Sequence, residues 1–283
     1  MLLALSLAAA AAPQPIAPAT FVQWTAHKGP RRYRALGVTV SIVPVRDRDF
    51  TSPRITISAR GKKPLTLKGE IGVSAPHQIG IGSLARGQYA SVVISGYTGG
   101  AHCCDHVIAV QPTATGFRTV DLGQWNGGMP GFPKDLSGDG IADFRFVDNR
   151  FLYAFTSYAE SFAPPLVMNI RGGKAVDVSA EPAFRFLFAD YLPEARRGCV
   201  SPAPQASPNG ACAAYAAAAA RLGQFRWAWP VVLKSYDRKA KWDWPTGCRG
   251  AAPAGQCPQG RQIAYPSYPQ ALRAFLKRTG YLG

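Results

Sequence analysis

The segment from Asp135 to Asp143, DLSGDGIAD, has the residue types and spacing of a calcium-binding loop. Oxygen-bearing side chains stand at its first, third, fifth and ninth positions, and Gly140 allows a sharp turn. Calcium takes about six to eight oxygen ligands from carboxylates, carbonyls and water. A bare turn without an ion is the alternative, because Asp, Ser and Gly also dominate turns. We predict one calcium ion with the ligands Asp135, Ser137, Asp139, Asp143 and the backbone carbonyl of Ile141.

The loop lacks the Glu that closes an EF-hand at its twelfth position, where Phe146 stands. It instead resembles the D-x-[DS]-G-D-G-x-x-D loop of FG-GAP or VCBS repeat proteins, which lies between two strands. The resemblance implies a structural calcium ion and a β-rich, propeller-like repeat. Ser83–Val92 aligns with Asp135–Phe144 at an offset of 52 residues, but it has no carboxylate at the ligand positions and is expected to bind no metal. Residues 20–190 hold about three such repeats at most, which favours a partial or open assembly.

A second group of reactive side chains lies in the sequence GGAHCCDH. His102 and His106, with Asp105 or a thiolate, would suit zinc or copper, and the two cysteines would suit a redox pair. Alternation along a strand separates the histidines from Asp105, which makes a closed four-ligand site hard to build. We favour a vicinal disulfide between Cys103 and Cys104 that locks a turn, with long-range disulfides or a metal site as alternatives. Similar GGAHCC turns occur in exported bacterial proteins.

The charge distribution favours an anionic partner. The chain has 32 Lys and Arg against 16 Asp and Glu, a formal net charge of +16, and residues 191–283 hold 13 of the basic but 3 of the acidic residues. Cations beside exposed aromatic rings suit polyanions or glycans, without specific recognition of nucleic acid. A solvated basic surface without a ligand is the alternative. The predicted polyanion-binding residues are Lys234, Arg238, Lys239 and Lys241, followed by Trp242 and Trp244; two further clusters are Arg31, Arg32 and Arg34, and Arg60, Lys62 and Lys63.

The sequence contains no nucleophile elbow, zinc-protease helix, P-loop or dinucleotide-binding glycine pattern. With 4 histidines, it also offers few candidates for a His-based general acid or base. The leading hypothesis is therefore a non-catalytic, calcium-stabilised module that binds anionic envelope or extracellular material. The alternatives are an exported hydrolase or metal-dependent enzyme, and an adhesion or inhibitor protein.

The elements that would position these residues divide the chain into two parts. The 29 Gly and 24 Pro residues favour short strands and tight turns, and β-branched runs between residues 20 and 190 predict strands. We expect an α+β fold: an FG-GAP-like β-rich domain over residues 20–191, then a small disulfide-linked helical subdomain over residues 192–283. The predicted strands include Gly37–Val45, Arg54–Ala59, Ala90–Ser95, His106–Gln111 and Phe144–Val147.

Two helices are predicted in the second part. From Asn209 to Trp229, apolar residues recur every three or four positions, with Asn209 as the N-cap and Pro230 expected to kink or restart the helix. The residues of this apolar face are Cys212, Tyr215, Ala219, Leu222, Phe225 and Trp229. Pro269–Arg278 has Pro in its first turn, basic residues in its last turn and Gly280 beyond its end, which predicts a second helix.

The beginning of the chain and its cysteines both indicate export. The run MLLALSLAAAAA is too short to span a bilayer and fits the core of a signal peptide. Cleavage after Ala11 or Ala19 satisfies the A-x-A rule, and we favour a signal peptide of residues 1–19. No later run of 18 apolar residues predicts a transmembrane segment. The expected location is periplasmic or secreted.

The even number of cysteines in an exported chain predicts three disulfides. Apart from the adjacent pair, the cysteines are Cys199, Cys212, Cys248 and Cys257, and the sequence leaves their pairing open. We slightly favour a bond between Cys212 and Cys248, which would link the two ends of a helical segment.

Overall fold

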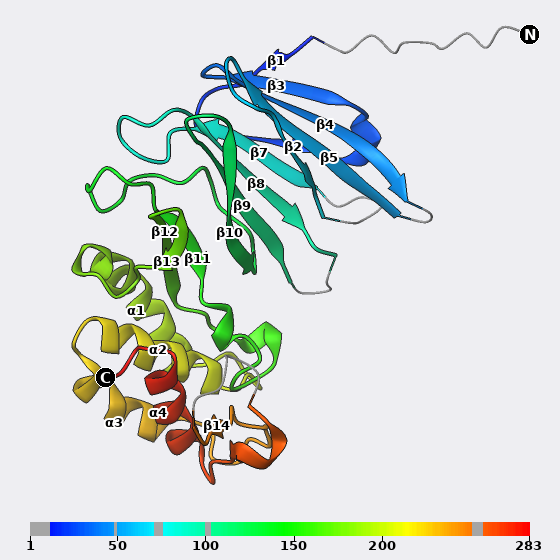
Figure 1. Cartoon of the computed structure of the whole chain (residues 1–283). Helices are drawn as coiled ribbons and strands as arrows, with labels where there is room; N and C mark the ends of the chain where they lie inside the picture. The colour runs from blue at the N-terminus through cyan, green and yellow to red at the C-terminus, as the bar shows by residue number, and fades with distance from the viewer. Residues whose placement is uncertain (1–11, 48–49, 71–75, 100–102, 251–256) are drawn as a thin grey trace, which may run out of the picture. The chain divides into compact units, whose positions relative to one another are not determined.

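The computed structural model describes residues 12–47, 50–70, 76–99, 103–250 and 257–283 (Figure 1). Most of the signal peptide predicted at residues 1–19 lies outside them. The chain forms two compact units: the first runs to Arg145 and includes Met168–Val176, and the second comprises Phe146–Val167 and Asp177–Gly283. The chain thus passes between units more than once, which differs from the single boundary predicted near residue 192. The change in amino-acid composition near residue 192 shows where the helices begin. The two units are instead defined by which strands and helices pack together.

The first unit contains a five-stranded sheet with the order β1-β3-β4-β5-β6. β1 pairs with β3 in parallel, and the other neighbours are antiparallel. The turn between β3 and β4 is Leu36-Gly37, where φ is 48° and 77°, as a tight two-residue hairpin requires. The strands are β1 Gln14–Pro15, β3 Arg31–Ala35, β4 Val38–Asp47, β5 Phe50–Ala59 and β6 Leu65–Lys68.

A second five-stranded sheet, antiparallel throughout, has the order β10-β9-β8-β7-β2. Apolar side chains from both sheets form one buried cluster, so the sheets pack face to face as a sandwich. The strands of this sheet are β2 Phe21–Trp24, β7 His77–Gly82, β8 Ser91–Tyr97, β9 Asp105–Pro112 and β10 Phe117–Trp125. The buried cluster includes Val40, Ile42, Ile55, Ile57, Ile79, Ile81, Val92 and Val110.

A third sheet has the order β11-β12-β13, formed by Phe144–Val147, Pro165–Arg171 and Lys174–Asp177. The five strands predicted from sequence are confirmed, with shifts at their ends. The fold is α+β, and its described strands do not form a closed propeller. The FG-GAP-like repeat stays a prediction.

The helices of the second unit pack around α2 (Asn209–Arg221) (Figure 1). Every residue of α2 from Asn209 to Ala219 is buried. Alanine is the best helix former and has the smallest side chain that still favours a helix, so neighbouring helices can approach α2 closely. The other helices are α1 Arg185–Val200, α3 Phe225–Ser235 and α4 Tyr268–Arg278.

Short elements complete the fold. The 3-10 helices are η1 Ala26–Lys28, η2 Asn149–Phe151, η3 Tyr158–Glu160, η4 Pro182–Phe184 and η5 Gln259–Arg261, and the short strands β14 Gly247–Cys248 and β15 Gln262–Ile263 pair with each other. Among the described helices, none combines the length and apolar character that a bilayer crossing needs.

The helix predicted from Asn209 to Trp229 is wrong in its extent. α2 and α3 are separate helices with a turn at Gly223, where φ is 74°. A glycine in this left-handed conformation ends a helix, although the apolar spacing continues across it. Pro230 lies inside α3, and the N-cap of α2 is Pro208 instead of Asn209. The second predicted helix is confirmed as α4, which follows Ser267.

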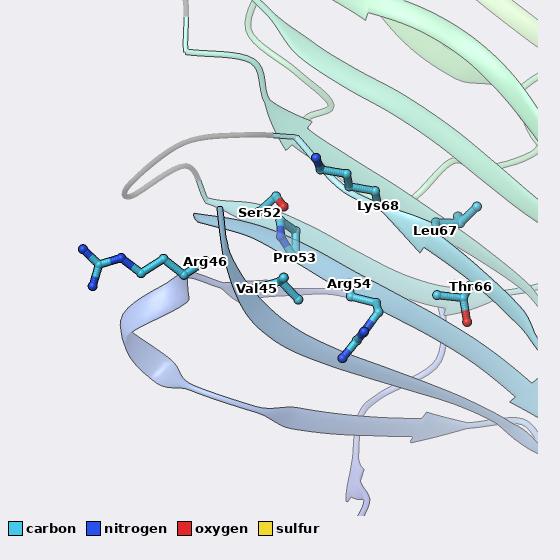
Figure 2. Close-up of a pocket in the computed structure, with 8 residues that line it drawn as sticks. All are labelled: Val45, Arg46, Ser52, Pro53, Arg54, Thr66, Leu67 and Lys68. Carbon is cyan, nitrogen blue, oxygen red and sulfur yellow. The ribbon is translucent and has the colours of Figure 1, made fainter. Parts of the chain in front are cut away.

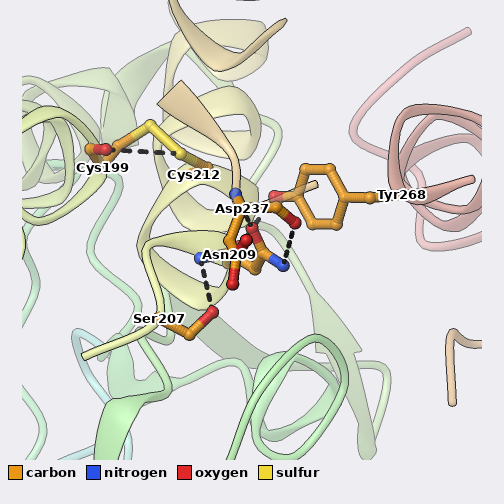
Figure 3. Close-up of a disulfide and its surroundings, with 6 residues drawn as sticks. All are labelled: Cys199, Ser207, Asn209, Cys212, Asp237 and Tyr268. Carbon is orange, nitrogen blue, oxygen red and sulfur yellow. Dashed lines mark hydrogen bonds between the residues drawn. A yellow bond between two sulfur atoms is a disulfide. The ribbon is translucent and has the colours of Figure 1, made fainter. Parts of the chain in front are cut away.

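The pairing favoured between Cys212 and Cys248 is also wrong. Cys199 of α1 is bonded to Cys212 of α2 (Figure 3). Cys248 is bonded to Cys257. α1 packs against α2 and brings two buried cysteines together, a contact that spacing along the chain does not reveal. A disulfide closing a loop of this size stabilises a fold by about 3 kcal/mol.

Candidate functional site

The predicted calcium loop is held by hydrogen bonds from its own backbone. The carboxylate of Asp135 accepts from the N–H groups of Gly138 at 2.7 Å and Gly140 at 2.9 Å. Asp139 accepts from the N–H of Ile141 at 2.8 Å. Such Asx-type bonds stabilise a tight turn whether or not an ion is present.

Asp143 closes the loop from its buried end. Its Oδ2 accepts from the N–H groups of Leu136 at 2.6 Å and Ser137 at 3.1 Å, and its Oδ1 accepts from Asn169 Nδ2 at 2.6 Å. Burial raises the pKa of Asp143, and these three hydrogen bonds oppose the rise. The carboxylate therefore ties the loop to β12.

One carboxylate of the loop is paired with a cation outside it. Asp139 Oδ2 lies 3.7 Å from Arg171 Nη2. Within the described part of the chain, no three His, Cys, Asp or Glu side chains are grouped so as to hold a metal ion. The calcium site at Asp135, Ser137, Asp139, Ile141 and Asp143 stays a prediction.

The segment that aligns with the loop at an offset of 52 residues is its neighbour in space. Ala85 forms an antiparallel bridge with Ile141. Arg86 N donates to Gly140 O at 2.8 Å, and Ala142 N donates to Leu84 O at 2.9 Å. The segment therefore positions the loop beside β8.

His77 and His106 lie on one face of three adjacent strands. In the register of the sheet, His77 of β7 is opposite Gly96 of β8, which is opposite His106 of β9. A Cβ atom on Gly96 would lie 2.8 Å from His77 Nε2 and 3.1 Å from Glu70 Cγ. Glycine is therefore required between the histidines, because Glu70 covers this position.

Both ring nitrogens of His106 meet carboxylates. Nδ1 lies 2.5 Å from Glu70 Oε1, and Nε2 lies 3.0 Å from Asp121 Oδ1. Burial lowers the pKa of His106, but the hydrogen bonds and charges of the two carboxylates outweigh it and raise the pKa above its usual value. In this arrangement neither nitrogen faces a metal site. His102, the other predicted ligand, lies outside the described residues.

The structure pairs Cys103 with Cys104, which is the vicinal disulfide favoured from the sequence. Thr98 closes this turn: its hydroxyl lies 2.9 Å from Cys104 O and 3.1 Å from Cys104 N. Burial raises the pKa of the neighbouring Asp105. At this end of the sandwich, Thr98 thus holds the disulfide turn, and Glu70 and Asp121 hold His106.

The four predicted polyanion-binding cations are all exposed in the second unit. Lys234 is in the last turn of α3, and the other three follow the helix. Arg238 lies over the ring of Tyr236 at 4.9 Å and donates to Leu233 O at 2.8 Å. Among the described residues, no ion pair includes any of the four. Residues 234–241, here called the basic segment, thus carry four cations and one acidic residue, Asp237, and have a net positive charge.

The basic segment is anchored to the buried helix α2 (Figure 3). Asp237 N donates to Asn209 Oδ1 at 2.9 Å, and Lys239 N donates to Asp237 Oδ1 at 2.8 Å. Asn209 is fully buried, and its carbonyl accepts from the Tyr268 hydroxyl at 2.7 Å. Burial raises the pKa of Tyr268 well above its ordinary value, so it is a neutral donor. These bonds fix the backbone from which the cations project.

A pocket of about 520 Å³ opens beside this segment. Glu160 accepts there from the Thr156 and Ser157 hydroxyls and from Ser207 N, which lowers the pKa of its carboxyl. Because its residues come from three separate stretches of chain, spacing in the sequence gave no signal for it. Other lining residues include Asp237, Lys241 and Trp242.

The two tryptophans that follow the cations, Trp242 and Trp244, are both partly buried against the protein. Trp242 Nε1 donates to Tyr153 O at 3.2 Å, and Trp244 packs on Phe155 and Tyr268. Neither is fully exposed. Of the two rings, only that of Trp242 lines the pocket, so it is the one that a ligand in the pocket could contact.

The comparisons with known proteins identify the family. Residues 189–280 match the model of the sll0997 C-terminal domain. The chain is 36% identical over 234 residues to the probable thylakoid lumen protein sll0997 of Synechocystis, which covers 81% of this chain and 68% of that protein. It is 32% identical over 205 residues to the uncharacterized protein y4bJ of Sinorhizobium fredii, which covers 68% of this chain and 30% of that protein. No solved structure matches. The chain belongs to the sll0997 family.

The disulfides and the lumenal relative agree on a compartment outside the cytoplasm. Disulfides persist in oxidising compartments, and the thylakoid lumen is also extracytoplasmic. The protein is periplasmic or secreted.

Proposed function

We propose that this protein is an exported, non-catalytic module that binds anionic polymers of the cell envelope or extracellular material through the basic segment. The observation that carries the proposal is the exposure of Lys234, Arg238, Lys239 and Lys241 without an ion-pair partner among the described residues. Uncompensated cations attract a polyanion over distances of about a Debye length, roughly 8 Å at physiological salt. The net charge of residues 191–283 adds to this attraction.

The anchoring of the segment supports binding of an extended ligand. Its backbone is bonded to Asn209, and Arg238 rests on the ring of Tyr236. A preorganised set of cations loses less conformational entropy when a ligand binds than a flexible one does. The affinity of such a site falls as salt rises, because binding releases counterions.

Calcium has a structural role in this proposal. Asp135, Asp139 and Asp143, with Ser137 and the carbonyl of Ile141, would hold one ion in an FG-GAP-like loop of the β-rich unit. Asp135 and Asp139 are exposed and accessible to an ion. With three carboxylates, the expected dissociation constant is on the order of 10⁻⁴ to 10⁻³ M, as in extracellular modules.

Heparin affinity chromatography tests the proposal. The variant K234Q/R238Q/K239Q/K241Q removes four cations from the basic segment. The control R196Q/R249Q/R261Q/K277Q removes four other exposed cations from the same unit and changes the net charge equally. We expect the first variant to elute at clearly lower salt than the wild type, and the control to elute close to it. Equal elution of the two variants would show that only total charge matters.

A further inference from the structure

We propose that the outward face of the β1-β3-β4-β5-β6 sheet is a second binding surface, and that its ligand is an acidic polysaccharide. The face is defined by strand alternation. Ile42, Ile55 and Ile57 are buried in the sandwich, so the residues between them on β4 and β5 point away from it. This surface belongs to the first unit and does not depend on the basic segment.

The register of the sheet assembles three rows of side chains on this face. One row is Arg34, Thr39 and Ser58; the next is Arg32, Ser41, Thr56 and Thr66; the third is Val43, Arg54 and Lys68. The residues come from four strands, so their proximity is a property of the fold and not of sequence spacing. We call these rows the outer sheet face.

The outer sheet face contains four cations, five hydroxyls and no Asp or Glu. Arg32 and Arg34 stand on β3, whereas Arg54 and Lys68 stand on β5 and β6. Hydroxyl side chains fill the space between, and Thr56 and Thr66 hydrogen-bond to each other at 3.0 Å. β3 and β5 are two strand spacings apart, which is about 10 Å. A ligand that spans the face would thus meet positive charge at both borders and hydrogen-bonding groups in the middle.

One end of the face is hollowed into a pocket of about 330 Å³ (Figure 2). Arg54 and Lys68 line it as direct cross-strand neighbours, together with the hydroxyls of Ser52 and Thr66. Ser52 is 4% exposed, so its hydroxyl lies at the base of the surface. Figure 2 shows the Arg54 and Lys68 side chains pointing away from each other, so each cation can contact its own acidic group, such as a carboxylate, sulfate or phosphate. The remaining lining residues are Val45, Arg46, Pro53 and Leu67.

The side chains of the face favour a polysaccharide over other polyanions. The three rows contain no aromatic ring on which a nucleobase could stack, and the exposed Phe50 lies beyond them, at the first residue of β5. The one apolar residue of the three rows is Val43, and its side chain offers too little apolar surface to insert into a membrane. Hydroxyls that both donate and accept hydrogen bonds match the hydroxyls of sugar rings, and the bordering cations match acidic substituents. An acidic polysaccharide meets both requirements.

Binding of oligogalacturonate to the full-length protein tests this inference. The variant R32Q/R34Q/R54Q/K68Q removes the cations of the face. The control R86Q/K134Q/R145Q/K174Q removes four exposed cations elsewhere in the first unit. We expect the dissociation constant to rise at least tenfold for the first variant and less than threefold for the control. Equal effects of the two variants would overturn the inference.

A second variant separates sugar recognition from charge. S41A/T56V removes two hydroxyls and leaves every cation in place, so it should weaken oligogalacturonate binding several-fold and leave polyphosphate binding unchanged. Equal loss with both ligands, or no loss with either, would contradict a polysaccharide site. If the outer sheet face instead governs binding to vesicles containing anionic lipid, the occupant is a membrane and the inference is wrong.

The basic-segment variant, measured with the same ligands, keeps this inference distinct from the proposed function. If the basic-segment variant bound these ligands as tightly as the wild type, the proposed function would be wrong, but the inference about the outer sheet face would not be affected. The substituted side chains are exposed or partly exposed, and an unchanged circular dichroism spectrum and melting temperature would show that each variant is folded.

Discussion

The ring of His106 has a carboxylate at each nitrogen, so its hydrogen bonding depends on pH. The ring bridges Glu70, which follows the last strand of one sheet, and Asp121 in the other sheet. The protonated ring donates to both carboxylates, whereas the neutral ring has one donor for two acceptors. The ionised bridge therefore stabilises one end of the sandwich.

We expect this bridge to make the stability of the protein depend on pH. Because the folded-state pKa of His106 is raised, its contribution is fully present below the unfolded pKa of about 6.5 and is lost as pH rises through the folded value. The melting temperature of wild type relative to H106Q should therefore decrease from pH 5.5 to pH 8.5. Parallel melting curves for the two proteins across this range would contradict the prediction.

The predicted calcium loop offers a substitution that separates the turn from the ion. In D139N, the side-chain oxygen can still accept from the N–H of Ile141, but one ligand charge is lost. If the dissociation constant is about 10⁻³ M, then about 10 mM calcium stabilises the wild type by about 1.4 kcal/mol, a shift of a few degrees in melting temperature. We expect D139N to lose this shift and to melt like the wild type in chelator. If the melting temperature of the wild type did not change with calcium, the prediction of a bound ion in this loop would be wrong.

At the scale of elements, strands were more predictable than helices. β4 and β5 are long, and their alternation of buried and exposed residues is visible in the sequence. α2 is buried all round, so its Ala-rich sequence has no polar face to show where it begins or ends. The turn at Gly223 preserves the helical spacing of apolar residues and therefore conceals the break.

Sites formed between elements were not predictable from spacing. The bond between Cys199 and Cys212 depends on how α1 packs against α2. Likewise, Glu70 and Asp121 reach His106 only because two sheets meet at one end of the sandwich. A calcium loop could be proposed from the sequence because its candidate ligands are local in sequence, and it stays a prediction.

The close packing around α2 makes it intolerant of larger side chains. Ala217 is fully buried, whereas Ala220 near the end of the same helix is partly exposed. We expect Ala217→Leu to lower the free energy of unfolding by about 1–3 kcal/mol or more, because a full core cannot take extra methylenes without strain. Ala220→Leu should cost clearly less. Urea denaturation of both variants measures the difference, and equal costs would mean that the packing is loose.

For the whole molecule, the two proposed surfaces lie on different units. The basic segment belongs to the second unit, and the outer sheet face belongs to the first. A protein with two such sites can bind two polymer chains at once, which converts binding into cross-linking.

Cross-linking can be measured directly as turbidity or as growth of the scattering radius when the protein is titrated into long polygalacturonate. We expect a maximum at an intermediate ratio of protein to polymer, because excess protein leaves each polymer saturated and unbridged. Either quadruple variant, K234Q/R238Q/K239Q/K241Q or R32Q/R34Q/R54Q/K68Q, should bind without forming such complexes. Undiminished complexes with both variants would mean that other surfaces bridge the chains.

The bond between Cys199 and Cys212 also constrains how the protein is made. Both cysteines are almost completely buried between helices, where an oxidising enzyme cannot reach their sulfurs. Oxidation must therefore precede the final docking of α1 on α2. We therefore expect the polypeptide to reach an oxidising compartment with this region still open to oxidation.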